Sequence, residues 1–209
     1  MEDIMKTGTT TLGLVAKDCI IMAADKRATA GNFIAGKKTV KVLPVAETMA
    51  LTTAGSVSDI QLLVKLIRAE LNLKKLRTGR ESTVNEAANL LGGIVYSNIR
   101  RFSTIPGIVH FLFGGYDETG GHLYDIYPDG SVTEIDDFTA SGSGGTFAFG
   151  VLDSQYKADM KEEDAVELAL KCVNAALQRD SASGDGVDVI AINKKGVRKV
   201  VSKEVSVKV

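Results

Sequence analysis

Histidine and cysteine are scarce in this chain, and tryptophan is absent. The 209 residues include two histidines and two cysteines. Their spacing matches no zinc motif, so we expect no metal site. A Ser-His-Asp or Cys-His enzyme would need a histidine beside its nucleophile, but His110 lies in an apolar strand-like run and His122 beside a turn. We interpret both histidines as structural, and Cys19 and Cys172 as reduced core cysteines.

Long hydrophobic runs and an excess of one charge are also missing. No apolar stretch reaches the roughly 18 residues of a membrane span, and the opening MEDIMKTG lacks the apolar region of a signal peptide. The net charge of −1 gives no polybasic face for nucleic acid or anionic lipid. With 44% hydrophobic and 24% charged residues, the chain has the balance of one globular domain. We expect a cytoplasmic protein that binds neither nucleic acid nor membrane.

Hydrophobic periodicity predicts strands grouped apart from helices. Short apolar runs bounded by turn residues predict strands at 19–25, 39–43, 49–53, 107–117, 122–128, 131–136, 187–193 and 197–202. Three helices are predicted from possible capping pairs and helical spacing, and they start near Ser58 with Gln61, Thr83 with Glu86, and Asp159 with Glu162. The third should run to about Arg179. This grouping predicts an α+β protein in which helices cover mainly antiparallel sheets.

Three polar or glycine-rich stretches offer cofactor sites that we judge weak. The stretch GNFIAGKKT (31–39) has P-loop glycines and a lysine, but position 38 is a lysine where Mg²⁺ needs a hydroxyl, and a strand follows. SGSGGTFAFG (141–150) departs from the dinucleotide pattern because position 147 is phenylalanine. DSASGDGVD (180–188) misses calcium-loop spacing, which leaves a turn or a loosely bound cation.

The opening KTGTTTLGLV, residues 6–15, offers a different chemistry. If the chain is cut between Gly8 and Thr9, Thr9 carries both a hydroxyl and a free α-amine. An α-amine has a pKa of roughly 8, so it can accept the hydroxyl proton without a histidine. Gly8 lacks a Cβ and would allow the tight backbone in which the Thr9 hydroxyl reaches its carbonyl. The alternative is a glycine turn leading into a β-branched strand.

Such a nucleophile needs a positive charge, a carboxylate that holds it and an N–H for the oxyanion. Asp25 ends a predicted strand, Lys41 lies unexpectedly between valines, and Gly55 lies at a strand-to-helix junction. Each also has an ordinary interpretation: a strand-end charge, an outward-facing lysine and a turn glycine.

Taken together, the motifs resemble a known family. The stretches TGTTTLGL, TAGSVSD, SGSGGTFAFGVLDSQY and QRDSASG, together with Asp25, Arg27 and Lys41, resemble the β-subunit of the archaeal 20S proteasome over nearly the whole chain. The resemblance implies an N-terminal-nucleophile hydrolase with a four-layer αββα sandwich. It implies that residues 1–8 form a propeptide removed by self-cleavage, and that 9–209 form the catalytic domain.

The resemblance also assigns roles by position. Thr9 would be the nucleophile, Asp25 and Lys41 a charge pair that tunes it, and Gly55 the oxyanion donor. Ser143, Asp180 and Ser183 would orient the α-amine and relay protons. The backbone of Thr29 and Gly55 would hold an extended substrate, whose side chain would enter a pocket lined by Ala28, Thr39, Thr53 and Val57. Thr53 is smaller than the apolar residue expected there.

The implied enzyme is a threonine endopeptidase without a cofactor. Its implied partners are proteasome α-subunits, copies of itself in seven-membered β rings of an α7β7β7α7 stack, and unfolded proteins delivered by a regulatory ATPase. Two alternatives remain: a processing-dead structural ring subunit, and the related bacterial two-ring threonine protease, which the LDSQY and QRDSASG stretches disfavour.

Overall fold

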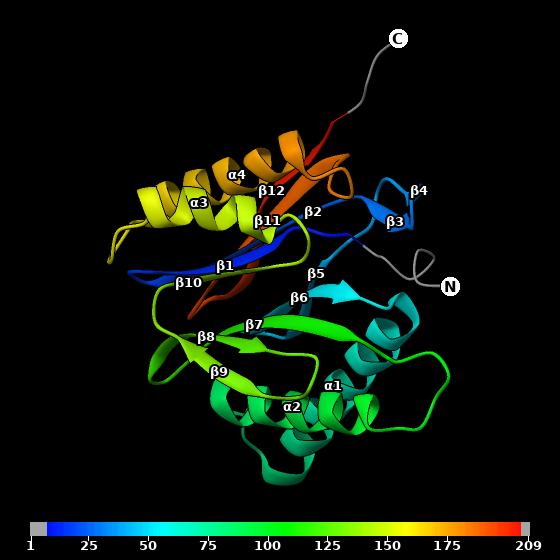
Figure 1. The fold of residues 1–209 in the computed structure, drawn as a ribbon. Coiled ribbons are helices and arrows are strands. Elements are labelled where there is room, and N and C mark those ends of the chain that lie inside the picture. The colour runs from blue at the N-terminus through cyan, green and yellow to red at the C-terminus, as the bar shows by residue number, and fades with distance from the viewer. Residues whose placement is uncertain (1–7, 206–209) are drawn as a thin grey trace.

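The computed structural model describes residues 8–205, whose elements are stacked in four layers (Figure 1). Two antiparallel sheets lie face to face in the middle, and a pair of helices covers the outer face of each sheet. The predicted α+β sandwich is therefore confirmed. Residues 1–7 of the predicted propeptide lie outside the described residues.

The first sheet has the strand order β10-β1-β2-β11-β12, and each neighbouring pair is antiparallel. The strand β2 is buried at all seven positions. Because helices cover one face of this sheet and the second sheet covers the other, β2 is a continuous apolar run instead of an alternating one. The strands are β1 (Thr11–Ala16), β2 (Cys19–Asp25), β10 (Phe138–Ser141), β11 (Gly186–Asn193) and β12 (Gly196–Glu204).

The second sheet has the order β5-β6-β7-β8-β9, so its strands follow one another as a meander. The meander predicted for the three strands after the second helix is confirmed. A separate two-stranded hairpin, β3 with β4, follows β2. The strands are β3 (Ala28–Ala30), β4 (Phe33–Gly36), β5 (Val42–Ala46), β6 (Met49–Gly55), β7 (Val109–Asp117), β8 (Gly120–Ile126) and β9 (Val132–Ile135).

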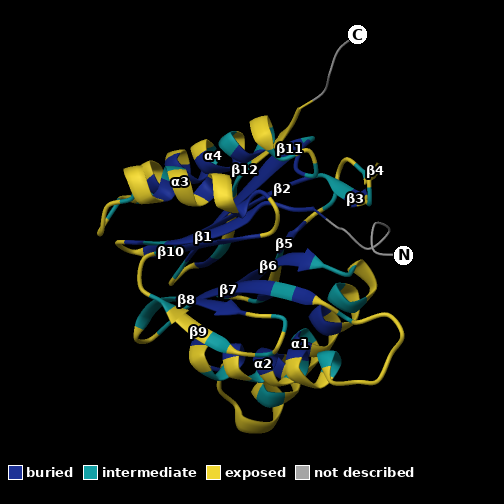
Figure 2. Ribbon diagram, in the orientation of Figure 1, coloured by how far each residue is buried: buried dark blue, intermediate teal, exposed yellow. Residues whose placement is uncertain are grey.

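The helices complete the layers and enclose three hydrophobic clusters. One cluster lies between α3, α4 and the first sheet, one lies between α1, α2 and the second sheet, and the third lies between the two sheets. Figure 2 shows the buried residues concentrated in the sheets and on the inner faces of the helices. No helix within residues 8–205 combines the length and apolarity needed to cross a bilayer. The helices are α1 (Val57–Thr78), α2 (Val84–Ile99), α3 (Gly145–Gln155) and α4 (Glu162–Arg179).

The helix starts confirm one capping prediction and contradict another. Thr83 and Glu86 form a reciprocal capping box at the start of α2, as predicted. The predicted box of Ser58 with Gln61 is wrong, because the N-cap of α1 is Ser56, two residues before Ser58. Ser56 Oγ donates to Asp59 Oδ2 at 2.5 Å instead of accepting a backbone N–H.

Other differences come from short or glycine-rich segments. Helix α3 and the short strands β3, β4 and β10 were not predicted. The third predicted helix begins at Glu162 with Lys161 at its N-cap, not near residue 159. The strand predicted at 39–43 begins only at Val42, so Lys41 precedes β5. These shifts matter because the 141–145 segment and Lys41 both contribute to the site described below.

Candidate active site

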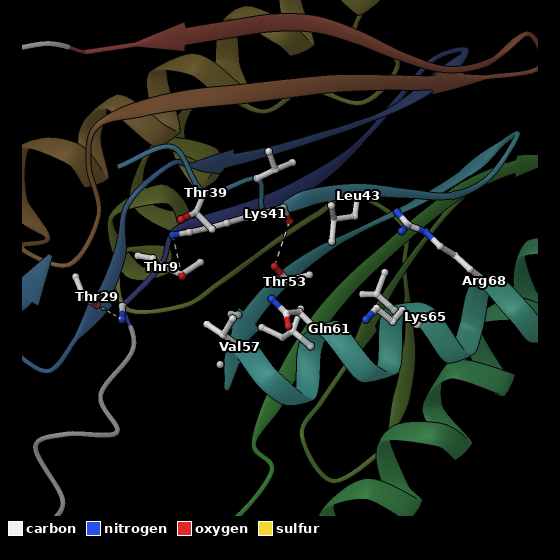
Figure 3. A pocket seen from close by; sticks show the side chains of 17 residues that line it. Thr9, Thr29, Thr39, Lys41, Leu43, Thr53, Val57, Gln61, Lys65 and Arg68 are labelled. Carbon is white, nitrogen blue, oxygen red and sulfur yellow. Dashed lines mark hydrogen bonds between the residues drawn. The ribbon is translucent and has the colours of Figure 1, made fainter. Parts of the chain in front are cut away.

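Thr9 lies two residues before β1 at the edge of the space between the sheets, and a lysine points at its hydroxyl (Figure 3). Lys41 Nζ donates to Thr9 Oγ1 at 2.9 Å and to Asp25 Oδ1 at 2.6 Å. All three residues are buried, and Lys41 retains only 4% of its exposed surface. The side chain of Lys41 therefore connects the hydroxyl to the carboxylate, and its alternative interpretation as an outward-facing lysine is wrong.

Asp25 is held rigidly at the end of β2. Its Oδ1 accepts the backbone N–H of Thr10 at 2.9 Å, and its Oδ2 accepts those of Arg27 and Gly184, each at 3.0 Å. With the Lys41 ammonium, four donors therefore surround a carboxylate that is 1% exposed. Such a fully hydrogen-bonded carboxylate can remain buried and fix the position of the lysine.

Burial lowers the pKa of Lys41 below its ordinary value of 10.5. Removing the ammonium from water disfavours its charged form, and the attraction of Asp25 offsets this effect only in part. A lysine of lowered pKa has a larger neutral fraction near pH 7 than a surface lysine. Neutral Nζ can accept a proton from the hydroxyl that it contacts.

Ser143, Asp180 and Ser183 form a second polar group on the other side of Thr9. Asp180 Oδ2 accepts from Ser143 Oγ at 2.7 Å and from Ser183 Oγ at 2.6 Å. Ser143 Oγ also accepts the backbone N–H of Thr9 at 3.3 Å. Ser183 instead shares a 2.6 Å hydrogen bond with Thr10 Oγ1. The three predicted residues therefore meet, but only Ser143 directly contacts the nitrogen of Thr9.

Gly55 ends β6 beside this group with φ of +113°. A Cβ at this position would overlap the carbonyl oxygen of Ile108, so the conformation and the space both require glycine. Its neighbour Ser56 donates its N–H to Ile108 O, towards β7. Because successive N–H groups of a strand point to opposite edges, the Gly55 N–H points away from β7, where the β5 pairing has already ended.

A cavity of about 300 Å³ opens beside Thr9 (Figure 3). All five predicted substrate-binding residues line it together with Thr9, Lys41 and Gly55, and they are Ala28, Thr29, Thr39, Thr53 and Val57. Of the wall formed by α1, the sequence analysis named only Val57. The remaining residues of that wall are Ile60, Gln61, Val64, Lys65 and Arg68, whose helical spacing could have identified a shared face. The cavity combines apolar and hydroxyl-bearing residues with two cations, Lys65 and Arg68, on α1.

The stretches considered as cofactor sites have other contacts. Residues 33–36 form strand β4 in the hairpin, so no helix follows to bind a phosphate. The glycines at 144 and 145 begin α3 and pack against Thr10 and Ala140. In the 180–188 stretch, Asp185 pairs with Arg27 at 2.8 Å and Asp188 lies 3.1 Å from Lys26. These carboxylates therefore serve internal ion pairs.

His110 joins the two sheets close to the site. Its Nδ1 shares a 2.6 Å hydrogen bond with Ser141 Oγ of the first sheet, and its Nε2 a 2.5 Å bond with Asp125 Oδ1 of the second. Asp125 Oδ2 in turn accepts from Thr139 Oγ1 at 3.1 Å. His122 is bonded to Thr119 and Glu134 within the second sheet. Both histidines thus have the structural setting that the sequence suggested.

Comparison with known proteins identifies the family. A model of the family described as "Proteasome subunit" matches residues 5–192. The chain belongs to the proteasome subunit family. Among curated relatives, "Proteasome subunit beta" of Ferroglobus placidus is 43% identical over 98% of this chain and 96% of its own length. The same-named proteins of Archaeoglobus fulgidus (43% identical, 93% and 89% covered) and Methanopyrus kandleri (39%, 97% and 96%) are also similar.

The proteasome family match spans the whole polar group from Thr9 to Ser183 and both sheets up to Ile192. The four-layer sandwich is the N-terminal-nucleophile hydrolase fold of this family, and the similarity to archaeal β-subunits confirms the predicted archaeal type. Membership of the proteasome family also implies assembly with α-subunits into a core particle.

Proposed function

We propose that this chain is a catalytically active threonine endopeptidase of the 20S proteasome, with Thr9 as its nucleophile. The observation that carries the proposal is the position of Lys41 Nζ, 2.9 Å from Thr9 Oγ1 and 2.6 Å from Asp25. A threonine hydroxyl alone is a poor nucleophile, and a buried lysine of lowered pKa is the kind of group that activates one. The adjoining cavity supplies room for a substrate side chain.

The first reaction in this proposal is self-cleavage. Thr9 Oγ attacks the carbonyl carbon of Gly8 while its proton passes to neutral Lys41 Nζ. The Gly8–Thr9 C–N bond then breaks, the nitrogen takes the proton back from Lys41 Nζ, and an ester joins Gly8 to the Thr9 hydroxyl oxygen. Water hydrolyses this ester and releases a carboxylate on Gly8. Residues 1–8 leave as the propeptide, and residues 9–209 remain as the catalytic domain.

Substrate hydrolysis in this proposal uses the new α-amine. The amine accepts the hydroxyl proton, the Lys41 ammonium held by Asp25 places a positive charge beside Thr9, and the Gly55 N–H binds the oxyanion. Ser143, which donates a hydrogen bond to Asp180, positions the amine. Ser183 also donates to Asp180 and is itself hydrogen-bonded to Thr10. Substrate backbone pairs with Thr29 and Gly55, and the side chain before the cut enters the cavity lined by Ala28, Thr39, Thr53 and Val57.

The setting of this activity belongs to the same proposal. The subunit assembles into seven-membered β rings between α-subunit rings, in the cytoplasm, and receives unfolded proteins from a regulatory ATPase. In this arrangement the enzyme acts only on chains that have entered the particle.

Thr9→Ala and Thr9→Ser test the proposal in particles assembled with α-subunits. We expect Thr9→Ala to abolish hydrolysis of fluorogenic peptides, because no other side chain replaces the nucleophile, while Thr9→Ser retains measurable turnover. Native electrophoresis checks that both variants assemble. An active Thr9→Ala particle would contradict the assignment of Thr9 as the nucleophile. An assembled wild-type particle that hydrolyses no peptide would favour a structural subunit.

A further inference from the structure

Gly8 is held in place from both ends and is closed off on one side by Ala182. Its N–H donates to Thr29 Oγ1 at 2.9 Å, and the next N–H, that of Thr9, donates to Ser143 Oγ at 3.3 Å. A Cβ built on Gly8 would overlap the Cβ of Ala182 and lie 3.0 Å from both Ala182 Cα and Ser143 Oγ. Any other residue at position 8 therefore meets backbone as well as side-chain atoms.

The turn that carries Ala182 has little freedom to retreat. The Ala182 N–H donates to Asp180 Oδ1 at 3.2 Å, and the Ser183 N–H donates to Asp180 O at 3.2 Å. Two residues after Ala182, the Gly184 N–H donates to the buried Asp25 at 3.0 Å. The turn beside Gly8 is thus hydrogen-bonded to two carboxylates of the site. If residue 8 is larger than glycine, residue 8 must therefore shift, because the turn cannot.

Gly8 borders two cavities, and the wall formed by Ala182 belongs to only one of them. Ala28 and Thr53 line the substrate cavity, whereas Ala182 lines the second cavity and not the first. A side chain at position 8 would therefore point at Ala182 and not into the cavity that accepts substrate side chains. A side chain at position 8 of the uncut chain and the side chain of a bound substrate before its cleavage site would therefore contact different residues.

We propose that Ala182 is a specificity-determining residue that restricts self-cleavage to glycine at position 8, independently of the cavity that selects substrates. This inference rests on the proposed self-cleavage at Gly8–Thr9. It also gives a reason for the glycine that the sequence did not: space against Ala182. The particle then has two separate preferences, one for its own propeptide and one for its substrates.

The expected loss of self-cleavage rate follows from the geometry of the attack by Thr9 Oγ on the Gly8 carbonyl. Reacting atoms must approach to about 3–3.5 Å with aligned orbitals, and a misplacement of about 1 Å can cost roughly 100-fold in rate. The Cβ of an alanine at position 8 would overlap that of Ala182 so closely that restoring ordinary contact displaces residue 8 by more than that distance. We expect Gly8→Ala to slow self-cleavage by roughly 100-fold.

A compensating substitution tests the inference. Wild type, Gly8→Ala, Ala182→Gly and the double variant are each assembled with α-subunits, and intact mass follows the appearance of a chain beginning at Thr9. We expect Ala182→Gly to be cut at nearly the wild-type rate, and the double variant to recover at least 10-fold over Gly8→Ala. The matched control combines Gly8→Ala with Ala28→Gly, which removes a methyl on the cavity side and should restore nothing.

A second variant tests the same wall without changing residue 8. Ala182→Val enlarges the wall, so we expect slow self-cleavage of the natural Gly8 sequence, while the same variant expressed to begin at Thr9 hydrolyses peptides. Equal rates for Gly8→Ala and the double variant, or normal self-cleavage of Ala182→Val, would overturn the role of Ala182. Failure of the wild type itself to be cut would instead overturn the proposed function.

Discussion

Two buried lysine–aspartate pairs lie side by side at the end of β2, and they differ in what the lysine contacts besides its carboxylate. Lys41 donates to Asp25 and to the Thr9 hydroxyl, and it lines a cavity. Lys26, the residue after Asp25, lies 3.1 Å from Asp188 and donates to Ser202 Oγ at 2.9 Å. Burial of an ion pair is therefore not sufficient to mark a site.

The carboxylates of the two pairs are also held differently. Asp25 accepts hydrogen bonds from three backbone N–H groups and Lys41. Within residues 8–205 neither oxygen of Asp188 accepts a hydrogen bond of good geometry, and only the charges of Lys26 and, at 3.7 Å, Lys199 offset its burial. The first pair is thus arranged to fix one lysine nitrogen precisely, which is what a reacting hydroxyl requires.

The largest expected effect separates the two lysines by activity. Lys41→Met should slow self-cleavage and peptide hydrolysis by roughly 10²–10⁴-fold, the usual range for losing a positioned proton-transfer group. Lys26→Met should leave both reactions within a few-fold of wild type. Intact mass and fluorogenic peptides measure the two reactions. Similar losses in both variants would show that the pairs act only through the fold.

The Lys26–Asp188 pair should matter for stability instead of activity. Lys26→Met leaves Asp188 buried with only the more distant Lys199, so we expect the free energy of unfolding to fall by about 3 kcal/mol. Adding Asp188→Leu removes the unpaired charge and should recover most of that loss. Urea unfolding of the isolated chain measures both values. If Lys26→Met is as stable as wild type, the Lys26 ammonium does not stabilise the buried Asp188 carboxylate.

The two histidines provide a smaller contrast. His110→Phe removes the partner of the buried Asp125 and Ser141, so we expect a loss of about 1–3 kcal/mol in the free energy of unfolding. His122→Phe breaks more exposed bonds to Thr119 and Glu134 and should cost less than about 1 kcal/mol. Urea unfolding ranks the variants, and an equal or larger loss for His122→Phe would contradict the sheet-joining role of His110.

The smallest expected effect is a pH dependence of self-cleavage that distinguishes Lys41 from Lys26. If neutral Lys41 accepts the hydroxyl proton in the uncut chain, the self-cleavage rate rises with pH. It levels off above the Lys41 pKa, which burial places below 10.5. Lys26→Met should show the same pH profile as wild type, because the Lys26 ammonium that it removes does not contact Thr9. A rate that is independent of pH, or that falls as pH rises, would exclude Lys41 as the proton acceptor.

Local sequence signals predicted much of the framework. The apolar run ending at Asp25 and the capping box of Thr83 with Glu86 depend on neighbouring residues, so they were visible without a structure. Helix α3 was missed because its glycine-rich start has low helix propensity. The glycines are needed there because Thr10 and Ala140 lie against them.

Within the site, the sequence supplied residue types but not their distances. It suggested Lys41 from its place between valines, and the structure adds the two hydrogen bonds and the burial that lower its pKa. It could not indicate Ala182, because an alanine carries no chemical signal and acts only through contact with Gly8. It also missed Lys65 and Arg68, whose place at the cavity depends on how α1 packs.

The most direct test of the account is the intact mass of this subunit from particles assembled with α-subunits, measured beside Thr9→Ala and Lys41→Met. We predict that the wild-type chain begins at Thr9 and that both variants retain residues 1–8. A wild-type chain that still carries residues 1–8 in an assembled particle would contradict the account, because Thr9 would then have no free amine.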